Sequence, residues 1–243
     1  MWKSPISLLL LPFKHILYMS TIGDKIESIK GQIPKQIRLV AVSKTKPLEL
    51  IQEAYDAGHR IFGENKALEM RDKHEALPEN IHWHYIGHLQ TNKVKYIAPF
   101  VKLIHAVDSL KLLKEINKQA LKNDRIISCL LQFHIASEET KFGLSPEEAY
   151  EILKSPEFNE LKNIKITGVM GMASNTFNTD LIREEFKYLH TIFQNIQFDF
   201  FLGNIFFREV SMGMSSDYQI AAQEGSTLIR IGSSIFGNRN YSK

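Results

Sequence analysis

The sequence holds one cysteine, Cys129, in 243 residues, so it has neither a disulfide framework nor a multi-cysteine zinc or iron–sulfur site. It also lacks a charge excess, since 30 basic residues stand against 27 acidic ones, a net charge of +3. This balance excludes nucleic acid or an acidic membrane surface as the main partner. A single thiol suits a reducing compartment, and we therefore expect a cytoplasmic protein.

The first 20 residues, MWKSPISLLLLPFKHILYMS, lack the marks of a targeting or membrane segment. Lys14 and His15 interrupt the apolar run, no A-x-A cleavage site follows, and the run is too short to span a bilayer. We interpret residues 1–20 as an extra N-terminal segment, left by a start upstream of Met19 or packed on the domain. A single domain is expected over residues 21–243.

Short apolar runs alternate with amphipathic segments along the chain, which is 44% apolar and 23% charged, as globular proteins are. Each run is apolar or β-branched and is bounded by Gly, Ser or Asn, which is typical of strands. Strands are predicted at Ile37–Val42, Arg60–Phe62, Trp83–Ile86, Leu103–Ala106, Ile127–His134, Ile166–Met170, Glu209–Met212 and Leu228–Ile231. The clearest helices are predicted at Pro47–Ala57, Leu110–Leu121, Pro146–Leu153 and Asp180–Gln194.

This alternation predicts an α/β fold with a parallel sheet. Eight strand candidates in about 200 residues fit a single (β/α)8 barrel of the TIM type. The rival is an open doubly wound sheet, but the G-x-G-x-x-G fingerprint that favours it is missing after the first strand. Ser145 and Glu148 form a candidate capping box, and Pro47 and Pro146 suit first helical turns.

Lys44 follows the first apolar run directly, at the end of a barrel strand where this fold places its active sites. Burial lowers a lysine pKa, and the neutral amine is the nucleophile that forms a Schiff base. A solvated lysine capping the strand is the alternative. Lys46 abuts Pro47 and is expected to point into the loop, so we rank it below Lys44.

The loops after the last two strands read GMSSD and IGSSIFG and offer small residues, hydroxyls and free N–H groups. Barrels bind phosphate in these two loops. Ser215, Gly232 and Ser233 are therefore phosphate candidates, with an ordinary glycine–serine turn as the alternative. Arg230 lies inside the last apolar strand and needs a partner, either a structural carboxylate or a cofactor ring. Lysine and phosphate donors together indicate pyridoxal 5′-phosphate (PLP).

Two further groupings are weighed against this interpretation. His82 and His84 share one face of a strand, with His88 nearby, but catalytic zinc requires three protein ligands, so we expect no metal. The runs Met170–Met172 and Met212–Met214 are candidates to line a cofactor ring, with core filling as the alternative.

Seven motifs in this order resemble those of the pyridoxal phosphate homeostasis proteins of the YggS/PROSC type. They are AVSKTKP at 41–47, FGEN at 62–65, WHYIGHLQTNK at 83–93, HAVDS at 105–109, GVMGM at 168–172, SMGMSSD at 211–217 and RIGSSIFG at 230–237. The resemblance covers residues 37–238 and implies a barrel similar to the N-terminal domain of alanine racemase. His134 departs from the family pattern, which has asparagine there.

The resemblance also implies a set of cofactor-binding residues. PLP is expected as an internal aldimine on Lys44, with Arg230 at the pyridine nitrogen. Phosphate contacts are carried over to Ser215, Gly232 and Ser233, and Asn65 and His84 match residues that line the cofactor pocket. An arginine does not readily give up its proton, so it leaves the ring a weaker electron sink.

The expected function is therefore PLP binding for vitamin B6 homeostasis without robust catalysis, and we assign no catalytic residue. Because the chain ends soon after the eighth unit, we expect no second domain that would complete a racemase site, and a monomer. A slow stand-alone racemase or lyase, with His84 or His134 as the base, remains the alternative. Apo-enzymes that receive PLP are candidate partners, and the aromatic stretch FFLGNIFF at 200–207 is a candidate docking patch.

Overall fold

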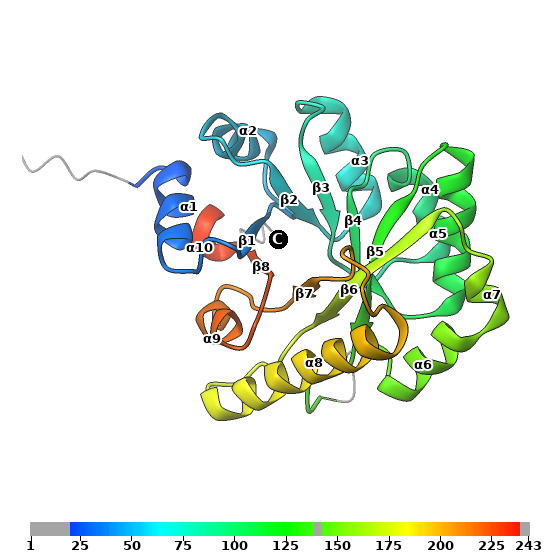
Figure 1. The fold of residues 1–243 in the computed structure, drawn as a ribbon. Coiled ribbons are helices and arrows are strands. Elements are labelled where there is room, and N and C mark those ends of the chain that lie inside the picture. The colour runs from blue at the N-terminus through cyan, green and yellow to red at the C-terminus, as the bar shows by residue number, and fades with distance from the viewer. Residues whose placement is uncertain (1–19, 139–141, 239–243) are drawn as a thin grey trace, which may run out of the picture.

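The computed structural model describes residues 20–138 and 142–238 and contains a closed barrel of eight parallel strands in sequence order. Figure 1 shows the strands at the centre with helices around them. The strands are β1 (Arg38–Val42), β2 (Ile61–Glu64), β3 (His82–Tyr85), β4 (Leu103–Val107), β5 (Ile127–Phe133), β6 (Ile164–Gly171), β7 (Glu209–Ser211) and β8 (Leu228–Ile231). The pairing of β1 with β8, which aligns Val40 with Arg230, closes the barrel. The (β/α)8 prediction is confirmed, and the eight strands lie within two residues of the predicted bounds.

Helices connect the strands on the outside of the barrel. In the described part of the chain they are α1 (Ile22–Gly31), α2 (Leu48–Asp56), α3 (Ala67–Ala76), the 3₁₀ turn η1 (Thr91–Lys93), α4 (Val94–Ile97), α5 (Leu110–Lys122), α6 (Pro146–Lys154), α7 (Pro156–Asn159), α8 (Thr179–Phe200), α9 (Tyr218–Gln223) and α10 (Ser233–Phe236).

The helix starts follow local capping chemistry. Ser145 and Glu148 form the predicted capping box at α6, and Pro146 occupies the first turn. Pro47 instead is the N-cap of α2, because its ψ of 160° is extended and outside the helix. The prediction for α8 was too short: apolar residues continue at helical spacing past Gln194, and Ile196 is buried one turn after the buried Ile192.

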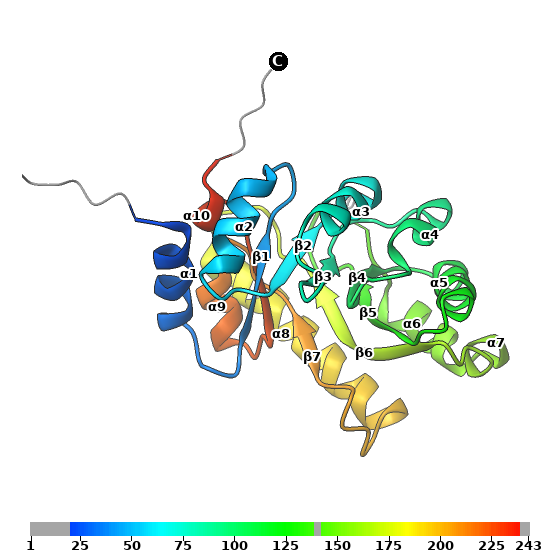
Figure 2. The same ribbon diagram turned by 90° about the horizontal axis from the view of Figure 1, so that it is seen from above.

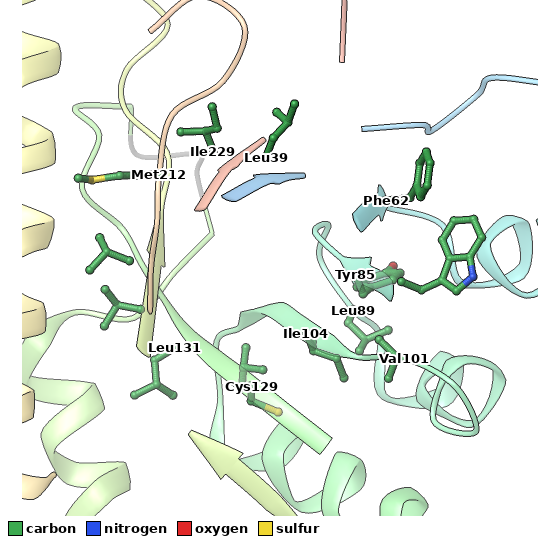
Figure 3. Close-up of a cluster of buried hydrophobic side chains, with 14 of the residues drawn as sticks. Leu39, Phe62, Tyr85, Leu89, Val101, Ile104, Cys129, Leu131, Met212 and Ile229 are labelled. Atoms are coloured by element: carbon green, nitrogen blue, oxygen red, sulfur yellow. The ribbon is translucent and has the colours of Figure 1, made fainter. Parts of the chain in front are cut away.

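Most of the core lies between the barrel and its helices, as Figure 3 shows for side chains that include Leu39, Phe62, Ile104 and Ile229. Adjacent residues of a strand point to opposite faces, so alternate positions point into the barrel. A separate buried cluster of Val40, Leu103, Ala106, Leu130, Met170 and Leu228 fills that interior. On β8, Ile229 therefore packs outward, whereas Leu228 and Arg230 belong to the inner face.

The two described ends of the chain meet at the closing seam of the barrel. Helices α1 and α10 lie side by side in both views (Figures 1 and 2). The expected extra segment, residues 1–20, falls outside the described residues except for Ser20. Among residues 20–138 and 142–238, none of the helices combines the length and apolarity needed to cross a membrane.

The aromatic stretch at 200–207 leads from α8 into β7. Leu202 and Ile205 are each 76% exposed and Phe206 is 51% exposed, so the expected exposed patch is present. Phe207 is instead fully buried and stacks between Phe193 and Phe201. Phe207 thus anchors the chain before β7, and the docking role of the exposed residues Leu202, Ile205 and Phe206 remains a prediction.

Candidate functional site

A cavity of about 350 Å³ opens at the carboxyl ends of β1, β7 and β8. We call it the Lys44 cavity. Of the described residues that line it, three are cations and none is a carboxylate. The lining is Val42, Lys44, Lys46, Ile86, Met172, Met214, Ser215, Ser216, Arg230, Gly232, Ser233 and Gly237. The structure thus brings five of the seven predicted site residues together from three separate strand ends.

Lys44 stands two residues after β1 and is half-buried, in agreement with its predicted place at the mouth of the barrel. The backbone on either side of it is held in place. The Nζ of Lys73 donates to the Ser43 carbonyl at 2.8 Å, and the Thr45 N–H donates to Glu69 at 2.6 Å. Thr45 has a φ of 63°, which is uncommon for a β-branched residue, so these contacts fix a strained turn around Lys44.

These contacts belong to an ion-pair cluster, which consists of the buried Ser43, Glu64 and Lys73 and the partly exposed Glu69. Lys73 Nζ lies 2.8 Å from Glu64 Oε1 and 2.7 Å from Glu69 Oε1, and the Ser43 hydroxyl donates to Glu64 at 2.6 Å. Burial raises the pKa of the Glu64 carboxyl, against the opposing pull of the Lys73 charge. The cluster supports the Lys44 turn and was missed in the sequence, where no helix was predicted around Lys73.

Lys46 shares the cavity with Lys44 but its amine is committed to the backbone. Its Nζ donates to the carbonyls of Phe236, Gly237 and Asn238 at 2.9–3.0 Å. An ammonium group has three hydrogens, so these bonds use all of them. Lys46 therefore joins the β1 loop to the end of α10, and it is poorly placed to act as a nucleophile.

The loops after β7 and β8 meet at the other side of the cavity. The Gly232 N–H donates to Ser215 Oγ at 3.3 Å, and Ser233 is exposed beside it. A Cβ on Gly232 would lie 3.2 Å from the Val42 carbonyl oxygen, so the backbone packs tightly against β1 here. Met172 and Met214 line the cavity, whereas Met170 and Met212 are fully buried in the core, so each methionine run is divided between the two predicted roles.

Arg230 reaches the cavity from inside the barrel and is 4% exposed. Its guanidinium donates to Ser211 Oγ at 2.6 Å and to the Gly171 carbonyl at 3.1 Å. Burial lowers the pKa of Arg230 to about 10, while the charge of Asp217 opposes this shift. The guanidinium therefore stays charged at neutral pH and remains a donor only.

The other two predicted residues lie outside the lining of the Lys44 cavity. Asn65 lines a neighbouring cavity of about 340 Å³ together with Tyr85 and His88. His84 is buried in the barrel interior, and its Nδ1 lies 2.9 Å from Nε2 of His105. Burial lowers the pKa of His84 to about 3 and that of His105 well below its usual value, so both rings are neutral.

His105 and Ser211 are buried polar residues that sequence reasoning missed as site residues. Ser211 is recoverable from alternation, because it lies two residues after the buried Glu209 of β7. His105 is recoverable in the same way, because Leu103 lies on the inner face and Ile104 on the outer one, and the register shift between Ile104 and Val107 interrupts the alternation only at Ala106.

The other two histidines weighed as metal ligands are His82 and His88. His82 is exposed, and His88 lies 3.1 Å from Asp108 and stacks on Phe142. Within residues 20–138 and 142–238, no group of three or more His, Cys, Asp or Glu side chains is arranged to hold a metal ion.

The fold and the cavity define a (β/α)8 barrel with a lysine at the end of its first strand and hydroxyl-rich loops after its last two. The family model described as "Alanine racemase, N-terminal domain" matches residues 18–240. The chain belongs to this family and, within it, to the pyridoxal phosphate homeostasis proteins, as its relatives show.

Curated relatives of that name match most of the chain. The protein from Aquifex aeolicus is 39% identical over 205 residues, which cover 84% of this chain and 88% of the relative. The protein from Homo sapiens is 33% identical over 244 residues, which cover 93% of this chain and 86% of the relative.

Solved structures agree with the fold. PipY from Synechococcus elongatus, solved without PLP, superposes with a TM-score of 0.83 at 32% identity and covers 89% of this chain and 100% of its own. PipY with PLP bound superposes with a TM-score of 0.79. Alanine racemase from Bartonella henselae reaches 0.66 at 16% identity over 91% of this chain and 60% of its own, which supports the shared fold alone.

Proposed function

We propose that this protein binds PLP in the Lys44 cavity and serves intracellular PLP homeostasis, holding the cofactor without robust catalysis. The observation that carries the proposal is the meeting of a half-buried lysine, a buried arginine and two hydroxyl-rich loops around one cavity. The names of the relatives and the PLP bound to PipY support it.

The residues present fit the chemistry of PLP. Bound PLP supplies two groups: an aldehyde, which condenses with a primary amine, and a pyridine ring, which withdraws electrons. Lys44 would hold the aldehyde end, while Ser215, Gly232 and Ser233 would hold the phosphate with hydroxyl and backbone N–H groups. The three cations in the lining suit a dianionic phosphate, and about 350 Å³ is within the range of small-molecule sites.

Arg230 would contact the ring nitrogen, and its chemistry favours binding over turnover. A charged guanidinium donates a hydrogen bond but does not readily give up its proton, so the ring nitrogen stays unprotonated. Of the two candidate bases, His84 is buried and neutral, and His134 Nε2 lies 2.8 Å from the Glu138 carbonyl oxygen. Asn65 and His84 would support the site from outside the cavity.

Three further expectations belong to the same proposal. The protein would act in the cytoplasm, which suits the free, buried thiol of Cys129. It would act as a monomer. PLP-dependent apo-enzymes would be the recipients of its PLP.

The test is titration of the purified protein with PLP, followed by absorbance and by removal of free PLP on a desalting column. Wild type should keep a protein-bound band near 420 nm, a value expected for such a linkage. Lys44→Ala should lose the band. Lys66→Ala, which removes an exposed lysine at the start of α3, is the matched control and should retain it. A band of equal strength in Lys44→Ala would overturn the assignment of the anchor.

A further inference from the structure

A chain of buried side chains continues from Arg230 across the inside of the barrel. Arg230 Nη1 lies 2.6 Å from Ser211 Oγ, which lies 2.9 Å from His105 Nδ1. His105 Nε2 lies 2.9 Å from His84 Nδ1. We call Arg230, Ser211, His105 and His84 the histidine chain. Its members come from β8, β7, β4 and β3, and each is at most 4% exposed.

Arg230, at one end of the histidine chain, sets the direction of every hydrogen bond in it. Arginine has no acceptor, so Ser211 Oγ must accept from Arg230. The one hydroxyl hydrogen of Ser211 then points to His105 Nδ1, which accepts it. Because a neutral imidazole carries one N–H, His105 donates from Nε2 to His84 Nδ1. His84 therefore carries its own hydrogen on Nε2.

The reverse direction, in which His105 donates to Ser211, is disfavoured because it leaves the Ser211 hydroxyl hydrogen without an acceptor. If His105 donated from Nδ1, Ser211 Oγ would accept twice, and its own hydrogen would have no acceptor. Among the described residues, Arg230 and His105 are the only hydrogen-bond partners of this hydroxyl. Leaving a buried donor unsatisfied costs about 1–3 kcal/mol.

We propose that Ser211, His105 and His84 are positioning residues that orient the Arg230 guanidinium toward the ring of bound PLP through this one-way chain. Ser211 is obliged to present a lone pair to Arg230, because its hydrogen is committed to His105. Every hydrogen in the chain points away from Arg230, and both rings are neutral, so the chain offers no proton to the ring nitrogen. This inference rests on the proposed function for its ligand, but the hydrogen-bond directions do not depend on it.

The directions are tested on the protein without added PLP. Long-range ¹H–¹⁵N correlation spectra report the tautomer of each histidine, with assignments from His84→Gln and His105→Gln. We expect both rings neutral at pH 7 with the hydrogen on Nε2. A hydrogen on Nδ1 of either ring, or a charged ring, would overturn the proposal.

The positioning role is tested by PLP affinity. Ser211→Ala should weaken PLP binding about tenfold, the scale of one lost contact to a charged group, with borohydride still trapping PLP on Lys44. Ser211→Thr keeps the hydroxyl and should restore most of the affinity. The control is Ser226→Ala, because Ser226 is also buried and, among the described residues, its hydroxyl bonds the backbone carbonyls of Val210, Met212 and Leu228 and no side chain.

The possible outcomes separate the two claims. Equal affinity losses in Ser211→Ala and Ser226→Ala would show a general packing effect and overturn the positioning role. Failure of Ser211→Thr to recover binding while remaining folded would do the same. If wild type binds no PLP at all, the proposed function fails, whereas the tautomers still decide the hydrogen-bond directions.

Discussion

Two buried polar networks flank the Lys44 cavity, and they stabilise it in different ways. The ion-pair cluster pairs opposite charges directly, with one lysine between two carboxylates on the β1–β2 side. The histidine chain holds one guanidinium through a neutral hydroxyl, Ser211, and continues through two neutral rings across the barrel interior. The first network fixes the turn that carries Lys44, and the second fixes a charged donor. A buried cation is thus kept either by a counter-charge or by oriented dipoles.

The largest effect is expected from breaking the ion-pair cluster. Lys73→Met should lower the free energy of unfolding by about 3 kcal/mol, because it leaves the buried Glu64 carboxyl without its cation. Urea unfolding measures this difference. Glu64→Gln combined with Lys73→Met should recover part of the loss, since it removes the stranded charge.

Lys66→Met is the control for this variant, because Lys66 is exposed at the start of the same helix. A loss in Lys73→Met no larger than that of the control would show that the cluster does not stabilise the fold.

The second effect is a pH dependence that belongs to the histidine chain. The pKa of His84 is lowered to about 3 in the folded protein against 6.5 in the unfolded chain. Between those values the unfolded chain binds more protons, so the free energy of unfolding falls as the pH falls below 6.5. Each such histidine contributes a slope of about 1.4 kcal/mol per pH unit.

His84→Gln should therefore flatten the profile of unfolding free energy between pH 6.5 and pH 4. The exposed His88 gives the control His88→Gln, which should leave the slope as it is in wild type. An unchanged slope in His84→Gln would contradict the neutral state assigned to this ring. For Glu64 the sign is opposite, because its raised pKa makes stability fall as the pH rises above 4.5.

The smallest effect is expected from Lys46, which joins the β1 loop to the end of α10. Lys46→Met removes the three bonds to the carbonyls at the end of α10 and should weaken PLP binding by about threefold to tenfold, roughly one hydrogen bond. Isothermal titration measures this change. Complete loss of binding would instead make Lys46 an essential contact of PLP.

The sequence predicted those features of the fold and the site that depend on local pattern. Strand ends and the alternation of apolar runs placed Lys44, Ser215 and Gly232 at one end of a barrel, because parallel strands all end on the same side. Alternation within β8 also assigns Arg230 to the inner face. The motifs then restricted the ligand to PLP.

Contacts that depend on packing between distant units were not predictable from that pattern. Lys73 reaches Ser43 across 30 positions, and His105 reaches Ser211 across 106. The same limitation explains His84 and Asn65, whose motifs lie on β3 and directly after β2 but whose side chains lie outside the lining of the Lys44 cavity. Local pattern locates a strand end, whereas the register of its neighbours decides what a side chain touches.

The central claim is that PLP is held by Lys44 and not by Lys46, since the two lysines share one cavity. Borohydride reduction of the PLP-loaded protein, followed by peptide mass mapping at residue level, tests it most directly. The account predicts one pyridoxyl adduct, on Lys44. An adduct on Lys46, or adducts spread over surface lysines with none on Lys44, would contradict it.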